Sequence, residues 1–103
     1  MPDTSDLNIQ QMRDAAGDAV KLLRSLSHED RLLLLCQLSQ QELCVSELED
    51  KLDIHQPNLS QHLGILRRNG LITPRRDGKH IYYHVSDPAV LAMLQTLYRQ
   101  FCH

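Results

Sequence analysis

The 103-residue sequence lacks the features by which several large classes of protein are recognised. It has no Trp, one Phe and three Tyr, and no apolar run approaches the roughly 18 residues that a membrane span needs. Its three cysteines form no C-x-x-C pair, which argues against a zinc ribbon or a thioredoxin-like motif. The first six residues are polar and acidic, so no signal peptide is visible. We therefore expect a cytoplasmic protein with reduced thiols and no membrane partner.

Motifs of the common enzyme classes are missing as well. The sequence has no Gly-rich phosphate loop, no His-Glu-x-x-His pair and no nucleophile elbow. Its six histidines and three cysteines fall into no recognisable catalytic pattern. The sequence therefore predicts a protein that is not an enzyme and needs no cofactor.

Charged residues are divided unevenly along the chain. Residues 1–53 carry 5 Lys/Arg against 11 Asp/Glu, whereas residues 54–103 carry 6 against 2. A basic patch on a chain whose net charge is −2 indicates a surface for a polyanion, although an unevenly charged solvated surface would give the same numbers. Five of the six later basic residues lie close together, namely Arg67, Arg68, Arg75, Arg76 and Lys79.

Apolar residues at helical spacing predict four helices in the first part of the chain. Their expected ranges are residues 7–26, 27–38, 46–53 and 56–69. Ser27 and Ser46 are followed by acidic residues as in a capping box, so we place the starts of the second and third helices there. Gly70 ends the fourth helix. The second helix is apolar on nearly all sides, so we expect it in the middle of the fold with Cys36 well covered.

Two strand-like segments and a closing helix follow. The segments cover residues 71–76 and 79–85, and Asp77-Gly78 between them fits a type I′ hairpin turn. Asp87-Pro88 caps a last helix whose apolar stripe reaches Phe101. This order predicts a mainly α winged helix-turn-helix fold with about five helices and a small two-stranded β-hairpin. We expect one domain over residues 1–103, with residues 1–6 disordered.

The fourth predicted helix has a polar face opposite its leucine stripe. Asn and Gln can bind adenine in the major groove, whereas an Arg-rich hairpin suits the DNA backbone or the minor groove. Each of these residues alone is also typical of an ordinary solvent-facing surface, and His62 borders the stripe, where it would pack internally. Together they favour double-stranded DNA over a protein partner. The predicted DNA-binding residues are Gln56, Asn58, Ser60, Gln61, His62, Arg67, Arg68, Arg75, Arg76, Lys79 and His80.

Three segments resemble the ArsR/SmtB family of winged-helix repressors, and the match covers about residues 18–102. Residues 59–72, which read LSQHLGILRRNGLI, resemble the recognition-helix signature of that family. Residues 75–83 resemble its wing, and residues 26–32 resemble the start of its second helix. The resemblance implies a homodimer formed through the first and last helices. It also implies that the dimer binds an inverted-repeat operator until an inducer releases it.

The metal sites known in this family are incomplete in this chain. The arsenic and cadmium type resembles the segment around Cys44, but Ser46 stands where a second thiolate is needed. Aligning the zinc type on Asp87 leaves two of four ligands missing, at Ala89 and Gln100. We therefore predict no metal site. The alternative function is a metal- or metalloid-responsive repressor that uses Cys44, or else His84, Cys102 and His103.

The two remaining thiols lie far apart in the sequence, Cys36 on the second helix and Cys102 at the end of the last. This placement resembles the dithiol branch of the family, which senses persulfides or oxidants. The resemblance implies that such reagents join Cys36 and Cys102 by a disulfide or a longer sulfur bridge and so release the operator. A bridge of this kind would lock a terminal helix that also forms the dimer interface. Two unconnected buried cysteines are the alternative.

Overall fold

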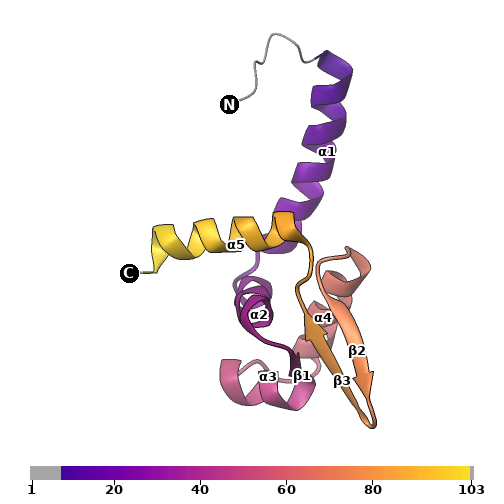
Figure 1. Cartoon of the computed structure of the whole chain (residues 1–103), viewed down its shortest axis with the longest axis vertical. Coiled ribbons are helices and arrows are strands. Elements are labelled where there is room, and N and C mark those ends of the chain that lie inside the picture. The colour runs from indigo at the N-terminus through magenta and orange to yellow at the C-terminus, as the bar shows by residue number, and fades with distance from the viewer. Residues whose placement is uncertain (1–7, 103) are drawn as a thin grey trace.

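The computed structural model describes residues 8–102, which form five helices and three strands (Figure 1). The helices are α1 (Ile9–Leu26), α2 (Glu29–Gln40), α3 (Val45–Leu52), α4 (Asn58–Arg68) and α5 (Pro88–Phe101). The strands are β1 (Leu43–Cys44), β2 (Thr73–Asp77) and β3 (His80–His84). The predicted mainly α winged helix-turn-helix fold is confirmed. Residues 1–6, for which disorder is expected, lie outside the described residues, and so does His103.

The sheet contains one strand more than the sequence predicted. Its antiparallel order is β1-β3-β2, with Leu43 opposite Tyr83 and Cys44 opposite Tyr82. Both residues of β1 are buried, and a strand of two residues is too short to show the alternation that reveals strands in a sequence. Strand β1 follows α2 closely in the chain and pairs with β3, so it connects the β2–β3 wing to the helical body.

The wing is the predicted hairpin, but its turn lies one residue further along the chain. Asp77 still pairs with His80, so the loop consists of Gly78 and Lys79 rather than Asp77 and Gly78. Gly78 has a φ of 62°, a conformation that glycine adopts without a steric cost. Glycine at the first loop position is the pattern of a type II′ turn, which also suits the twist of a hairpin.

The predicted cap at Ser27 is wrong, because Ser27 belongs to the end of α1. Its hydroxyl donates to the carbonyl oxygen of Arg24 at 2.9 Å. The N-cap of α2 is His28, whose Nδ1 accepts a hydrogen bond from the backbone N–H of Asp30 at 3.1 Å. The helical pattern of α1 continues to Leu26, and the chain uses the next two residues to change direction before α2 starts.

The predicted cap at Ser46 is also wrong. The N-cap of α3 is Cys44, whose backbone N–H donates to the Glu47 carboxylate at 3.0 Å, and Ser46 already lies inside the helix. Pairing of Cys44 in β1 holds its backbone extended, which is the conformation an N-cap residue needs. The strand that the sequence did not reveal therefore sets where α3 begins.

Helix α2 occupies the centre of the molecule, in contact with α1, α3, α4, α5 and β3. Leu34, Leu35 and Leu38 of α2 are almost completely buried, but Leu33 is 46% exposed. Cys36 is partly exposed, so the expectation that it is well covered is wrong. Helix α1 extends away from this body, and α5 runs across it (Figure 1). None of the helices within residues 8–102 is long and apolar enough to cross a membrane.

Candidate DNA interface and dithiol site

Helix α4 follows α3 after a tight turn. Asp53 adopts the left-handed conformation, with φ 54°, at the end of α3, and Ile54 is buried directly after it. The buried leucines of α4 lie on one side and fix its opposite side outward. The outward residues include most of the predicted DNA-binding set of this helix, namely Asn58, Ser60, Gln61, Arg67 and Arg68, all exposed.

Gln56 takes a part that the sequence did not reveal. Helix α4 starts at Asn58, two residues later than expected, and the Gln56 side-chain oxygen accepts a hydrogen bond from the backbone N–H of Ser60 at 3.0 Å. This bond satisfies one of the free N–H groups at the start of α4. Gln56 therefore caps the helix, and its contact with DNA stays a prediction.

Gly64 and Arg68 share the outer side of α4. A Cβ atom placed on Gly64 would lie 3.2 Å from a guanidinium nitrogen of Arg68, so the glycine makes room for that side chain. The guanidinium thus lies along the helix surface, one turn back from its own backbone. This position adds positive charge close to the polar residues that precede it.

His62 faces inward from α4, which agrees with the expectation that a residue bordering the leucine stripe packs internally. Its side chain is only 12% exposed, its ring centroid lies 4.5 Å from that of His28, and its Nε2 lies 3.9 Å from an Asp30 carboxylate oxygen. Burial lowers the pKa of His62, nearby His28 and Arg31 add to this effect, and Asp30 opposes it. The ring is therefore neutral at neutral pH. The contact of His62 with DNA stays a prediction.

The basic residues of the wing differ in their surroundings. Arg76, Lys79 and His80 are exposed around the hairpin. Arg75, in the middle of β2, is exposed too, but its Nε donates to both carboxylate oxygens of Glu42 at 3.0 and 3.1 Å. Its guanidinium also lies over the Tyr82 ring, 5.1 Å from the centroid.

Glu42 joins three segments of the chain at this point. A carboxylate oxygen lies 3.4 Å from Nδ1 of His84, in addition to the two contacts with Arg75. The hydrogen bond from Arg75 lowers the pKa of Glu42, and the same contact raises the pKa of Arg75. Sequence reasoning missed Glu42, because no spacing rule links it to a residue 33 positions later.

Cys36 and Cys102 lie at one apolar cavity between α2 and α5. Cys102 is the C-cap of α5, and its N–H donates to the Tyr98 carbonyl at 2.8 Å. The cavity has a volume of ≈ 430 Å³. Its lining comprises Glu29, Leu32, Leu33, Cys36, Leu97, Tyr98, Phe101 and Cys102.

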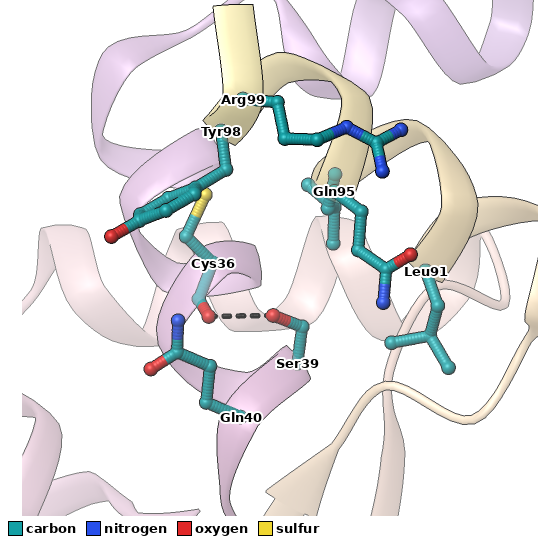
Figure 2. Close-up of a pocket in the computed structure, with 8 residues that line it drawn as sticks. Cys36, Ser39, Gln40, Leu91, Gln95, Tyr98 and Arg99 are labelled. Atoms are coloured by element: carbon teal, nitrogen blue, oxygen red, sulfur yellow. Dashed lines mark hydrogen bonds between the residues drawn. The ribbon is translucent and has the colours of Figure 1, made fainter. Parts of the chain in front are cut away.

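A second cavity, of ≈ 390 Å³, also reaches Cys36. Figure 2 shows the Cys36 sulfur beside the Tyr98 ring, with Gln95 and Arg99 of α5 lying over the cavity. The Cys36 carbonyl accepts a hydrogen bond from the Ser39 hydroxyl at 2.7 Å (Figure 2). Cys36 therefore borders a cavity of mixed polar and apolar lining as well as the apolar one.

The two thiols differ in exposure. Cys102 is exposed, whereas Cys36 is partly buried. Burial raises the pKa of the Cys36 thiol, and negative charge on Cys102 raises it further. Cys36 is therefore mostly a neutral thiol at neutral pH, and Cys102 is the more accessible of the two thiols.

The described residues of the alternative metal-responsive function, Cys44, His84 and Cys102, are not brought together, and His103 lies outside the described residues. Cys44 is buried, and its sulfur lies 3.3 Å from the Ser46 hydroxyl. His84 is held at the base of the wing by Glu42. Within residues 8–102, no group of three potential ligands includes Cys44, His84 or Cys102.

This fold, with a polar recognition helix and a basic wing, is that of a DNA-binding transcriptional regulator. The sequence profile described as "Bacterial regulatory protein, arsR family" matches residues 28–73. The "Biofilm growth-associated repressor" of Agrobacterium fabrum is 41% identical over 97% of this chain and 86% of its own length. The chain belongs to the ArsR family, as predicted, and this family consists of DNA-binding regulators rather than enzymes.

Two solved structures are similar to this one over nearly their whole length. The repressor BigR from Xylella fastidiosa has a TM-score of 0.84 at 38% identity, and the match covers 94% of this chain and 99% of BigR. Reduced HlyU from Vibrio cholerae has a TM-score of 0.87 at 40% identity, with coverage of 92% and 100%.

The contact between Glu42 and Arg75 leads to a prediction about DNA affinity. In the Glu42→Gln variant Arg75 is released toward phosphate, so we expect tighter binding to any duplex and a salt slope steeper by about one unit. Fluorescence anisotropy at several salt concentrations measures both quantities. The control is Asp50→Asn, which changes the net charge equally at an exposed position of α3. Weaker binding by Glu42→Gln alone would contradict this prediction.

Proposed function

We propose that this chain is a homodimeric transcriptional repressor that leaves its operator when Cys36 and Cys102 are bridged. The observation that carries the proposal is the apolar cavity between α2 and α5, which both thiols line. The raised pKa of Cys36, caused partly by Cys102, supports their proximity. The structural relative HlyU is described in a reduced form, which is consistent with redox chemistry in similar proteins.

The bridging chemistry follows from the exposure of the two thiols. The Cys102 thiolate attacks the sulfane sulfur of an organic persulfide, R–S–SH, and takes it up as R–S⁻ leaves. The Cys36 thiolate then attacks the inner sulfur of the Cys102 persulfide and displaces hydrosulfide, which leaves a disulfide. A longer bridge forms when a second R–S–SH has also converted Cys36 into a persulfide. The outer sulfur of that Cys36 persulfide then attacks the inner sulfur of the Cys102 persulfide, displaces hydrosulfide and leaves a trisulfide. Disulfides require Cα atoms within about 7 Å, so a wider separation favours the longer bridge.

The proposed bridge acts on DNA binding through contacts between helices. It fastens the end of α5 to α2, and α2 packs directly against α4. Bridging weakens operator binding only if the linked dimer differs in shape or rigidity from the reduced one. The proposal therefore requires that α5 change its position relative to α2, and with it the distance between the two recognition helices of a dimer.

The dimer is proposed because α1 and α5 expose more apolar surface than a monomer of this size needs. The exposed fraction is 70% for Ile9, 51% for Met12 and 79% for Phe101. An apolar groove of ≈ 600 Å³ also runs between these helices. It is lined by Leu23, Leu26, Ser27, Leu32, Ala92, Met93, Thr96 and Leu97. Burying these residues against a second copy of the chain would complete both cores.

The division between α4 and the wing predicts two kinds of DNA variant. Ser60→Ala and Gln61→Ala should each cost about 1–3 kcal/mol of discrimination between the operator and an altered operator. Arg76→Ala should weaken binding to all duplexes alike and lower the salt slope by roughly one unit. Binding to operator and random duplexes at several salt concentrations separates these effects. Wild-type affinity that does not change with salt would rule out a phosphate-binding wing.

The dimer interface can be tested on the exposed part of α1. Leu23→Asp places a carboxylate on the apolar groove, so we expect monomers at micromolar concentration in sedimentation experiments. Gln10→Asp adds the same charge at an exposed polar position of α1 and should leave the dimer intact. Leu94 is unsuitable for this test because it is buried within its own chain. A Leu23→Asp protein that stays dimeric would place the interface elsewhere.

The thiol switch predicts a distinct result for each cysteine. Cys36→Ser and Cys102→Ser should bind operator when reduced and keep binding it after treatment with an organic persulfide or an oxidant. Cys44→Ser should lose operator binding on treatment, as the wild type does, because Cys44 is buried beside Ser46. Intact mass distinguishes a disulfide, which lacks two hydrogen atoms, from a bridge with added sulfur. If Cys44→Ser abolishes the response and Cys102→Ser keeps it, the assignment is wrong.

A further inference from the structure

Three potential metal ligands from two helices meet beside the recognition helix. His28 and Asp30 lie at the start of α2, and His62 lies in the middle of α4. One ligand atom from each lies within 4.8 Å of the others. The two imidazole rings are 4.5 Å apart between centroids and tilted by 52°, so they are not stacked flat against each other.

We infer that His28, Asp30 and His62 form a binding site for a late first-row divalent cation such as Zn²⁺. Two imidazoles and one carboxylate suit this class of ion, and three protein ligands leave a position for water. The site is independent of the proposed thiol switch, since no cysteine belongs to it.

The distances require only a modest closure of the site. Around a tetrahedral Zn²⁺ with bonds of about 2.0–2.1 Å, ligand atoms lie roughly 3.3 Å apart. His62 Nε2 and the Asp30 carboxylate are already 3.9 Å apart. His28 is exposed and Asp30 is partly exposed, so both side chains can rotate toward the ion without disturbing the core.

His62 is the fixed member of the group. Its side chain is 12% exposed, and its Nδ1 is buried without a hydrogen-bond partner. Nδ1 therefore does not hold the ring in place, whereas Nε2 is the atom directed at Asp30. A cation bound at Nε2 would give this buried polar ring a strong interaction that the chain itself does not supply.

Binding changes the part that His28 plays in α2. Its Nδ1 accepts the hydrogen bond from the Asp30 N–H, so a neutral ring carries its proton on Nε2. A cation at Nε2 moves that proton to Nδ1, and a cation at Nδ1 takes the lone pair directly. In both cases the capping hydrogen bond is exchanged for a metal bond, which ties the start of α2 to α4.

Titration of the reduced full-length protein with Co²⁺ tests the site through the visible absorption of the bound ion. We expect a saturable spectrum that Zn²⁺ displaces, and at least a tenfold loss of affinity in each of His28→Ala, Asp30→Asn and His62→Gln. The spectrum should persist in a Cys36→Ser/Cys102→Ser protein. Zn²⁺ should also raise the thermal unfolding midpoint of the wild type but not of His28→Ala, whose exposed side chain can be removed without opening the core.

The matched control is another His–Asp pair, His55 and Asp53, in the described part of the chain. His55 Nε2 lies 2.6 Å from an Asp53 carboxylate oxygen, and within residues 8–102 this pair has no third ligand. His55→Ala should therefore bind Co²⁺ like the wild type.

Zn²⁺ binding should also shift the backbone amide NMR signal of Asp30, because the hydrogen bond from this amide to His28 is lost. The inference is overturned if the wild type gives no saturable spectrum with millimolar Co²⁺, or if His62→Gln and His28→Ala bind as tightly as His55→Ala.

Discussion

Burial of α2 is the interaction on which the rest of the molecule depends. Leu34, Leu35 and Leu38 are almost inaccessible to solvent, and α2 touches the four other helices as well as β3. Removing one such leucine side chain from a packed core typically costs about 2–5 kcal/mol. Cys36 lies on the less covered side of the same helix, and β1 follows α2 directly in the chain. Displacement of α2 therefore reaches the DNA-binding elements and the thiol site together.

Apolar periodicity together with the Asp77-Gly78 turn signal was sufficient to predict the five helices within residues 8–102 and both strands of the wing. It fails where the determining interactions are short or distant in sequence. Strand β1 has only two residues, too few to show a period. Cys44 becomes the N-cap of α3 because it pairs with Tyr82 in this strand. Serine is a good N-cap in general, but at Ser27 the hydroxyl is used by the preceding helix. A propensity rule cannot foresee such competition, because it treats each helix end separately.

In the candidate sites too, the features set by local periodicity could be predicted, whereas those set by contacts between distant segments could not. The outward residues of α4 follow from the position of its leucines, and they are exposed as expected. In contrast, the attachment of Arg75 to Glu42 and the position of His62 beside His28 depend on how separate elements pack. The exposure of Cys36 was predicted wrongly for a similar reason. An apolar helix in the centre of a small domain still has one side that only a second chain or a terminal helix can cover.

Strand β1 has a consequence for how a dimer of this protein would respond to its signal. The wing is held to the body by the pairing of β1 with β3 and by a hydrogen bond from the Val85 N–H to the Leu38 carbonyl at 3.1 Å. The wing and α4 are thus both attached to α2, the wing through β1 and Leu38 and α4 by direct packing. In the proposed dimer, a signal that leaves these attachments intact would change the spacing and angle between the two subunits, and an operator whose half-sites lie about 34–36 Å apart is sensitive to that geometry.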